Sequence, residues 1–503
     1  MKSNSYLQYK FDKRFILYVI LFVGAFLRIL YFHQFDDYYD DWNFFFTVDP
    51  NISNENTWVR YFGDRRDALG YLPSEWNKVG EDFPYYFAFL TKFILSIIGY
   101  SVENAHIFLL TFSIGSFFII IKICDLIIKD INFKILVLIL IATNIFLIRE
   151  PNALRPHALS IFFTLLGLYY FILIYLKNKT SYKNIILFCF ITLFFISIWP
   201  LNLAFFGGQC CFLLKIYFNK KVKNLKILII PTLTIILLYL FLNYDYLEYQ
   251  VINKSQHYTP LKIRFFYTYF FNTFFGSVAF GGFMLLVFSY FCIKEILKTF
   301  KTSKYKLNLF IKNLENESIF LIIILTIYIL IIAYSLLRAP VMAPKYISFL
   351  VPIIIIWTSY KINQTKNKLA YYFVICFSLF NVTLYWDDIQ IDRPPTKEVL
   401  KIISESKTKK VYTANQSWVF NHYLAHHNIS LRKNINFYKF DEYEFNSLPN
   451  EFWFLCLNNP RFAIGDNNNP DDKNCFTFQE NNNLYLVKTI KLPDFLIHYI
   501  KKK

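Results

Sequence analysis

The sequence is poor in charge and in glycine. Only 17% of its 503 residues are charged and 13 are glycine, whereas 55% are hydrophobic and 21% are aromatic. Soluble domains carry roughly 25% charged residues. This composition therefore excludes a soluble enzyme, a fibrous protein and a disordered chain.

Other familiar signals are also missing. The eight cysteines have no zinc-type spacing, and the first apolar stretch lacks a small-residue cleavage site, so we interpret it as a retained membrane span. The net charge of +18 is carried largely by lysines in short loops between apolar stretches. Because no basic stripe with interleaved aromatic residues occurs, nucleic acid is excluded as a partner.

Long apolar stretches dominate what is present. About eleven of them are long enough to cross a hydrocarbon core of roughly 30 Å. The sequence therefore predicts a polytopic α-helical membrane protein with about eleven transmembrane helices. The expected spans are 15–32, 104–121, 135–148, 157–176, 184–199, 201–218, 226–243, 270–293, 318–337, 346–360 and 369–386.

Lysine and arginine placement predicts the orientation. Basic residues precede the first span, and every second loop after it is again basic. Because cytoplasmic loops carry an excess of Lys and Arg, we expect a cytoplasmic N-terminus and, after an odd number of spans, an extracytoplasmic C-terminus. The expected location is the cytoplasmic (inner) membrane. The basic loops are 129–134, 177–183, 220–226, 294–312 and 361–368.

Composition also divides the chain into two domains. Residues 1–386 form the predicted transmembrane domain, with a large outside loop at 33–104 that contains an interfacial amphipathic helix at 84–100. From residue 387 to 503 the chain turns towards Asn, Asp, Lys and Glu, and we expect a small extracytoplasmic α/β domain. Its expected strands are 410–414, 452–457 and 484–492, and its expected helices are 398–404 and 417–427.

Acidic residues gather in the outside loop. Four carboxylates follow the first span within six residues: Asp36, Asp37, Asp40 and Asp41. Such a cluster beside a membrane indicates a cation, a metal ion or a reaction that uses negative charge, although the start of a solvated loop is the simpler interpretation. Asp82 lies just before the interfacial helix, where acidic residues are also common for electrostatic reasons.

Basic residues lie at the outside ends of two later spans. Arg155 and His157 stand at the start of span 157–176, and Lys345 and Tyr346 at the start of span 346–360. A guanidinium at this depth either meets an anion or extends to the lipid headgroups. The two acidic segments and the two basic segments all fall on the predicted outside of the membrane. We therefore expect negative and positive side chains to meet in one outside-facing cavity.

This combination favours transfer of a group from a lipid-linked phosphate. Arginine and lysine would hold the leaving phosphate, and one aspartate would accept the proton of the attacking hydroxyl or amine. A phosphodiester leaves as a stable anion, so no second acid is needed, in contrast to glycoside hydrolysis. The donor's polyprenyl chain would lie between the helices.

The same residues resemble the GT-C superfamily of polyprenyl-phosphate-sugar-dependent glycosyltransferases. The similarity is to the bacterial branch of protein O-mannosyltransferases and the lipid A aminoarabinose transferase, and it covers roughly residues 15–360. This sequence departs from the family pattern at four positions. Asp41 replaces the glutamate of the acidic pair, and Pro84 is the only proline left of two. His157 replaces a tyrosine, and Lys345 replaces an arginine. The matching segments are Arg28 with Asp40-Asp41, Asp82-Phe83-Pro84-Tyr85-Tyr86, Arg155-Pro156-His157-Ala158-Leu159, and Lys345-Tyr346 with Val351-Pro352.

The resemblance implies an inverting hexosyl- or pentosyltransferase of the cell envelope. Its donor would be a polyprenyl-phosphate-linked sugar and its acceptor a lipid, a glycan or a protein, within membrane lipids. Asp40 would be the catalytic base beside Asp41, with Asp36 or Asp37 as the alternative base. Asp82, Arg155, His157, Lys345 and Tyr346 would bind substrate, and Asp40 with Asp82 would hold Mg²⁺ or Mn²⁺ if a metal is used.

A secondary transporter or lipid flippase is the alternative from a different class. Transporters are typically built from inverted repeats, with charges or helix breaks near mid-membrane. The charged elements of this sequence lie instead at the membrane edge, which favours the transferase.

Overall fold

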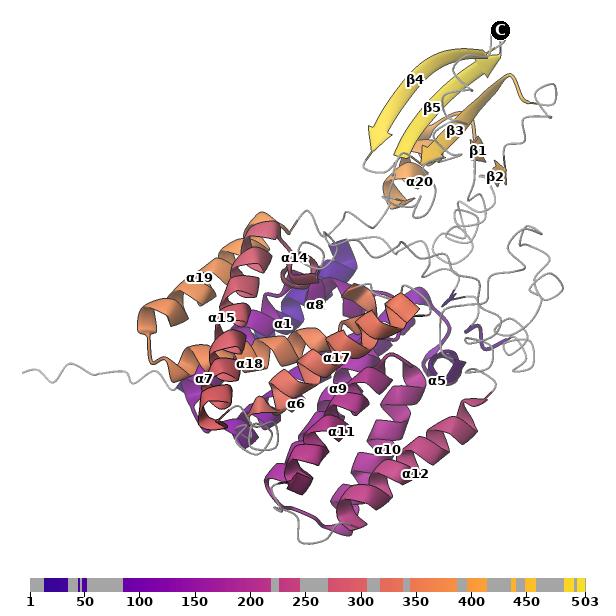
Figure 1. Ribbon diagram of the computed structural model, residues 1–503. Helices are drawn as coiled ribbons and strands as arrows, with labels where there is room; N and C mark the ends of the chain where they lie inside the picture. Colours follow the sequence, from indigo (N-terminus) through magenta and orange to yellow (C-terminus); the bar gives the residue numbers. More distant parts are fainter. Residues whose placement is uncertain are drawn as a thin grey trace, which may run out of the picture.

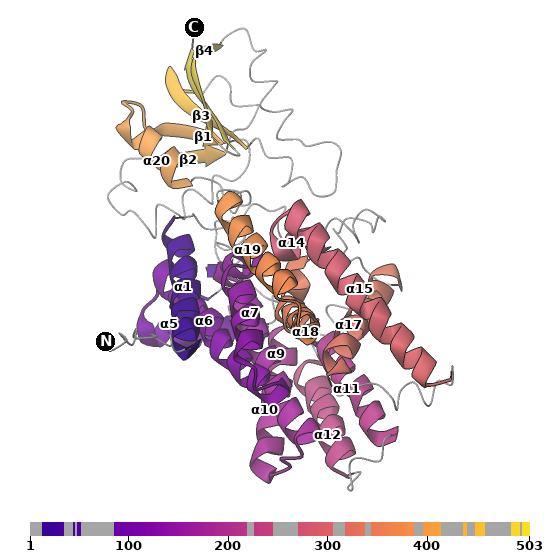
Figure 2. The same ribbon diagram turned by 90° about the vertical axis from the view of Figure 1, so that its left-hand side faces the viewer.

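The structure is a computed structural model with a helical bundle followed by a five-stranded sheet (Figure 1). It describes residues 13–34, 44–45, 48–51, 85–218, 226–244, 270–304, 317–337, 344–386, 396–413, 436–439, 448–457, 484–492 and 495–502. In both views the sheet lies beyond the end of the bundle at which α19 (Lys368–Leu384) ends (Figures 1 and 2).

Each predicted apolar stretch is helical, which confirms the helical fold class. The remaining helices of the bundle are α1 (Lys13–Gln34), α5 (Tyr85–Ile98), α6 (Val102–Ile127), α7 (Ile131–Ala142), α8 (Ile145–Arg149), α9 (His157–Phe171), α10 (Tyr182–Ile198), α11 (Asn202–Phe218), α12 (Lys226–Leu242), α14 (Phe270–Phe275), α15 (Val278–Thr302), α17 (Ser318–Leu337) and α18 (Leu350–Gln364). Short helical turns, η2 (Glu150–Asn152), η3 (Ile172–Leu176) and η6 (Pro344–Ile347), lie beside α8, α9 and α18.

Several helices are suited to crossing a membrane. Among the described residues, five are long and apolar enough alone, and a bent pair, α7 with α8–η2, makes a sixth. Four shorter apolar helices, α5, α10, α12 and α19, accompany them. Large apolar side chains on the outer faces are exposed, such as Phe22 at 71% and Phe241 at 80%. Helices that are apolar on every face are typical of membrane spans, so the chain is a multi-pass membrane protein.

Three predicted spans differ from the observed helices. Span 135–148 is bent by 64° between α7 and α8, because the Asn144 side chain caps a new helix by accepting from the Leu147 N–H. Span 270–293 is divided at Gly276, whose φ of +81° favours glycine, and α15 then continues to Thr302. Span 346–360 begins later, at Leu350, and ends at Gln364.

The helix ends separate into two groups, as the alternation of basic loops predicts. Polar and aromatic contacts join ends that were expected on the same side. On the predicted outside these are Phe32–His106 and Ser277–Asn381. On the predicted inside they are Asn363–Asp130, Tyr371–Asn132 and Lys361–Glu295. Which group faces the cytoplasm stays a prediction.

The C-terminal region forms the small α/β unit expected from its composition. Strands β1 (Lys410–Thr413), β3 (Glu451–Leu457) and β4 (Leu484–Leu492) and helix α20 (Thr396–Glu405) match predicted elements. Strands β2 (Asn436–Lys439) and β5 (Phe495–Lys502) were not predicted, and the expected helix 417–427 lies outside the described residues. The order is β2-β1-β3-β5-β4. β1 pairs in parallel with β2 and β3, and the other pairs are antiparallel.

Helix α18 lies at the centre of the bundle. The side chains from Ile353 to Trp357 are fully buried, and α7, α15, α17 and α19 pack around the helix. Burial on all faces explains why this stretch reads as uniformly apolar. The turn η6, which contains Lys345 and Tyr346, directly precedes this central helix.

Candidate functional site

The predicted site residues divide into two groups. The carboxylates Asp36, Asp37, Asp40, Asp41 and Asp82 lie outside the described residues. The structure does describe Arg155, His157, Lys345 and Tyr346. It also describes the segments that flank the acidic residues on their C-terminal sides.

Those flanking segments pack against each other. The buried Phe44 ring, three residues after Asp41, stacks on Phe87 at a centroid distance of 4.7 Å. Phe45 stacks in the same way on Tyr100 at 4.3 Å, and the Tyr100 hydroxyl donates to the Phe45 carbonyl oxygen over 2.9 Å. The chain that leaves the first acidic segment is therefore anchored to α5, the helix that follows Asp82.

The cations lie in turns and not in the helices themselves. Arg155 is half-buried between η2 and α9, and its N–H donates to the Ala153 carbonyl oxygen over 2.7 Å. Lys345 is half-buried in η6. The predicted span 157–176 begins two residues after Arg155, and α9 does begin at His157. Pro156 accounts for the place of Arg155 outside the helix, because proline disfavours helix in the residue before it.

The two turns meet around His157. Arg155 and Lys345 both act electrostatically on the imidazole of His157, which is 2% exposed. The same ring packs edge to face against Trp199, with centroids 5.9 Å apart. The Trp199 indole N–H donates to the Tyr346 carbonyl oxygen over 2.7 Å. Four of the predicted substrate-binding residues are thus brought together, although their positions span about 190 residues of the chain (155 to 346).

Trp199 is a residue of this cluster that the sequence analysis did not identify. It ends α10 and is followed by Pro200. A tryptophan beside a proline at the end of an apolar stretch was visible in the sequence. The pattern is also typical of aromatic residues at a membrane interface, so it did not by itself indicate a site.

A series of contacts connects the acidic and the basic parts of this bundle end. The Tyr86 hydroxyl, in the first turn of α5, donates to the Leu242 carbonyl oxygen over 2.7 Å. The neighbouring Asn243 donates through Nδ2 to Ser197 Oγ over 3.2 Å. Ser197 precedes Trp199 by two residues. The start of α5 is therefore linked through α12 to the turn that contacts η6.

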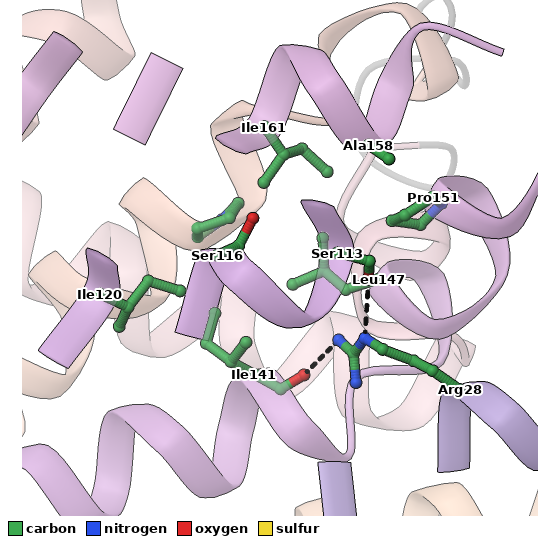
Figure 3. Close-up of a pocket in the computed structure, with 10 residues that line it drawn as sticks. Arg28, Ser113, Ser116, Ile120, Ile141, Leu147, Pro151, Ala158 and Ile161 are labelled. Atoms are coloured by element: carbon green, nitrogen blue, oxygen red, sulfur yellow. Dashed lines mark hydrogen bonds between the residues drawn. The ribbon is translucent and has the colours of Figure 1, made fainter. Parts of the chain in front are cut away.

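Arg28 is placed differently from the other cations. It is buried inside the bundle, and the part of the chain that the structure describes provides no carboxylate partner for it. Its guanidinium donates to Ser113 Oγ and to the Ile141 carbonyl oxygen (Figure 3). It also donates to Gly24 O in its own helix and to the Ala142 carbonyl oxygen. Ile141 and Ala142 end α7, where hydrogen bonds within the helix stop.

Arg28 therefore caps the break between α7 and α8. A cation at a helix C-terminus is favoured by the helix dipole, and Phe117 adds a ring 4.7 Å from the guanidinium carbon. Because its hydrogen bonds go to Ser113 and to carbonyl oxygens of the bundle itself, we interpret this first element of the sequence motif as structural.

Metal binding rests on residues that lie beyond the described ranges. Within those ranges no group of three or more His, Cys, Asp or Glu side chains could hold a metal ion. Asp40 and Asp82, which the sequence analysis named as ligands, fall outside them.

No protein-family model and no curated protein matches the sequence. Among solved structures, ArnT from Cupriavidus metallidurans in the apo state covers 91% of this chain and 95% of its own, at 9% identity and a TM-score of 0.44. ArnT bound to undecaprenyl phosphate covers 97% of this chain and 97% of its own, at 9% identity and a TM-score of 0.42. The oligosaccharyltransferase AglB from Archaeoglobus fulgidus, with an inhibitory peptide and a dolichol-phosphate, covers 85% of this chain and 64% of its own, at 11% identity and 0.40. ArnT is a lipid A aminoarabinose transferase, and both neighbours are GT-C proteins.

Proposed function

We propose that this protein is an integral-membrane glycosyltransferase that uses a polyprenyl-phosphate-linked sugar. It transfers one sugar to a lipid, glycan or protein acceptor at the extracytoplasmic face, with inversion at C1. The observation that carries the proposal is the contact between the turns of Arg155 and Lys345, which Trp199 joins through His157 and Tyr346. These turns lie at the bundle end where the flanks of the acidic segments are anchored.

Two half-buried cations in adjacent turns suit a lipid phosphate. Arg155 offers a planar guanidinium that can bind two phosphate oxygens at once, and Lys345 adds a point charge. Both cations are half-buried, so their interactions with a phosphate are stronger than those of fully exposed side chains. The polyprenyl chain would lie between the apolar helices.

The reaction balances with one base and one bound phosphate. The acceptor oxygen or nitrogen attacks C1 of the sugar, and its proton passes to the carboxylate of Asp40. The bond between C1 and the phosphate oxygen breaks, and its electron pair stays on the phosphate. Arg155 and Lys345 then hold polyprenyl phosphate, which carries one more negative charge than the donor phosphodiester. Asp82 and Asp41 would orient the acceptor.

A divalent metal, if the enzyme uses one, would be held by Asp40 and Asp82. Mg²⁺ and Mn²⁺ prefer carboxylate oxygens, and the stacking of Phe44 on Phe87, which follow Asp40 and Asp82 in the chain, supports this assignment. Its contribution would be to offset the negative charge of the phosphate.

The test is a transfer assay with Asp40→Asn in membranes supplied with a radiolabelled lipid-phosphate sugar. We expect the variant to lose transfer by roughly 10²–10⁴-fold, the usual contribution of a general base. Asp49→Asn is the matched control, since Asp49 lies in the same loop and, among the described residues, accepts hydrogen bonds from Asn51. Full transfer by Asp40→Asn would remove Asp40 from the mechanism, and Asp36→Asn and Asp37→Asn then identify the base.

The same assay separates a transferase from a flippase. A transferase releases labelled product with a new glycosidic bond, and the anomeric configuration of that bond reports inversion. Movement of the labelled lipid across the membrane without bond formation would contradict the proposal.

A further inference from the structure

We propose that Trp199 is a positioning residue that sets the place of Lys345 in the lipid-phosphate site. The inference rests on the proposed function, because it assigns Trp199 a role in the same phosphate site. Its starting point is the hydrogen bond from the indole N–H to the Tyr346 carbonyl oxygen, which joins the end of α10 to η6.

Trp199 is itself held firmly. Its backbone N–H donates to the Phe195 carbonyl oxygen over 3.2 Å, and its own carbonyl oxygen accepts from the Asn202 N–H over 2.9 Å. The Asn202 side chain donates to Phe195 O over 2.7 Å and accepts from Ser160 Oγ over 2.9 Å. The turn that carries the indole is therefore tied to both α10 and α9.

The indole reaches two parts of the cation cluster at once. Its ring packs against the Tyr346 ring at 5.6 Å and against the His157 ring at 5.9 Å. Trp199 is only 6% exposed, and a hydrogen bond in such a low-dielectric place is stronger than one in water. One side chain thus holds the turn of Lys345 against the first residue of α9.

Lys345 is adjacent to the anchored carbonyl group. Its Nζ lies 5.4 Å from the centroid of the Tyr346 ring, within the range of a cation–π contact. η6 has four residues and is separate from α18, which begins at Leu350, so a fixed carbonyl at Tyr346 restricts where Lys345 can point. A side chain that is already held in its bound position loses less entropy when the phosphate binds, so this restriction favours binding.

The first experiment removes the N–H and keeps an aromatic ring. We expect Trp199→Phe, in the purified full chain, to raise the Kd for undecaprenyl phosphate roughly five- to tenfold, the value of one hydrogen bond. Trp357→Phe is the matched control. Trp357 is also buried, and its Nε1 has no hydrogen-bond partner among the described residues, so its Kd should stay within about twofold.

The second experiment is a double-mutant cycle with Lys345→Met. If Trp199 acts through Lys345, Trp199→Phe has no further effect on Kd once Lys345 is replaced. Independent, additive losses would overturn the positioning role, because a merely structural defect weakens binding whichever side chain stands at 345. An unchanged Kd for Trp199→Phe would also overturn it.

Failure of the proposed function gives a different pattern. In that case the wild-type chain does not bind undecaprenyl phosphate above the level of a neutral polyprenol, and Lys345→Met changes nothing, which overturns both proposals. If Trp199→Phe does not fold, the residue is replaced with 3-benzothienylalanine. That side chain keeps the shape of tryptophan and carries sulfur in place of the indole N–H. The same rise in Kd is then expected, and normal binding would overturn the inference.

Discussion

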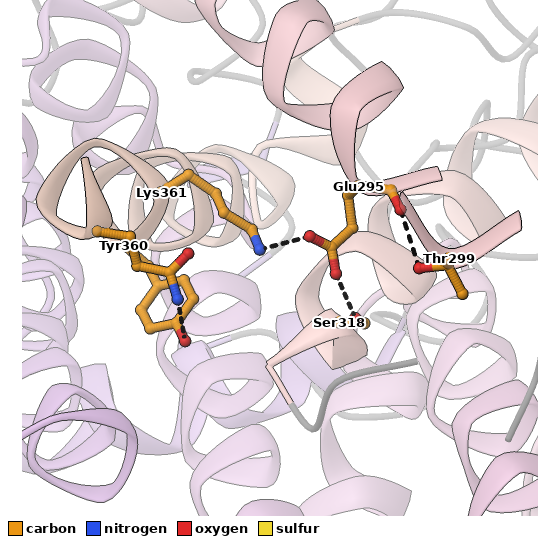
Figure 4. Close-up of polar contacts among 6 residues, drawn as sticks. Glu295, Thr299, Ser318, Tyr360 and Lys361 are labelled. Carbon is orange, nitrogen blue, oxygen red and sulfur yellow. Dashed lines mark hydrogen bonds and ion pairs between the residues drawn. The ribbon is translucent and has the colours of Figure 1, made fainter. Parts of the chain in front are cut away.

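The ammonium of Lys361 lies 2.8 Å from the carboxylate of Glu295, and both side chains are buried. The pair joins α18 to α15, and Ser318 Oγ at the start of α17 donates to the same carboxylate over 3.4 Å (Figure 4). The contact lies at the bundle end expected to face the cytoplasm, opposite the candidate site. It fixes the C-terminal end of α18, and η6 precedes the N-terminal end of the same helix.

Breaking this ion pair should destabilise the protein. Lys361→Met leaves the carboxylate of Glu295 buried without its cation, so we expect a loss of about 3–5 kcal/mol in unfolding free energy. Lys294→Met is the control, because Lys294 is exposed on the same helix as Glu295. The double variant Glu295→Gln with Lys361→Met should recover most of the loss, and thermal unfolding in detergent measures all three. Equal stability of Lys361→Met and Lys294→Met would contradict the assignment.

Two adjacent glycines at the start of α15 should respond in opposite directions. A Cβ on Gly281 would lie 2.5 Å from Asn272 Cα and from the Phe271 carbonyl oxygen, which are backbone atoms that cannot move aside cheaply. We expect Gly281→Ala to cost about 1–3 kcal/mol. A Cβ on Gly282 meets nothing within 4 Å, so Gly282→Ala should be neutral or stabilise by up to about 1 kcal/mol through helix propensity. Melting temperatures of the two variants provide the comparison.

Replacement of Arg155 distinguishes its two proposed roles, which are binding of the donor phosphate and extension to the lipid headgroups. If it binds the donor phosphate, Arg155→Met raises the KM for the lipid-phosphate sugar by roughly 10- to 100-fold, the loss of a charge-assisted hydrogen bond. If it only extends to the headgroups, KM stays the same. Arg149→Met is the control, since Arg149 pairs with Glu150 at 2.8 Å a short distance away in the chain. Steady-state kinetics in proteoliposomes measures both.

The C-terminal sheet should lose stability in mild acid. Burial lowers the pKa of His498, which is 3% exposed, below its usual value of 6.5. As pH falls through 6.5, His498 binds a proton in the unfolded chain but stays neutral in the folded sheet. The contribution of His498 to the stability of the sheet is therefore complete above that pH and declines below it. Hydrogen exchange of β4 and β5 peptides at about pH 7.5 and about pH 5.5 tests this. His498→Gln should remove the dependence, and a dependence that survives would assign it to other groups.

Much of the fold follows from local patterns. Apolar stretches located each helix because lipid demands apolar side chains on every outward face. The breaks were harder, since they depend on single residues. Gly276 interrupts a stretch that is otherwise apolar, and Asn144 starts a new helix inside another. Strand β4 was predicted with the observed bounds, whereas β2 is only four residues long and β5 carries His498 and two lysines.

Arg155 and Lys345 could be named from the sequence because charged residues at membrane edges are conspicuous, and their role in a site stays a prediction. The contact between their two turns could not be predicted. It includes the hydrogen bond from Trp199 to Tyr346, which is 147 positions away. Without comparison sequences, nothing local specifies such a pairing. Glu295 was missed for a related reason: the predicted span stopped at residue 293, two positions too early to include a buried carboxylate.

The capping of α7 by Arg28 has a consequence for biosynthesis. Arg28 is translated 113 residues before Ile141, whose carbonyl oxygen it binds. During that interval its guanidinium lies less than two turns from the end of α1, close enough to reach the headgroups. When α7 is made, Arg28 on α1 is already available to donate to the carbonyl oxygens of Ile141 and Ala142. A helix made earlier therefore supplies the cap for the bend of a helix made later.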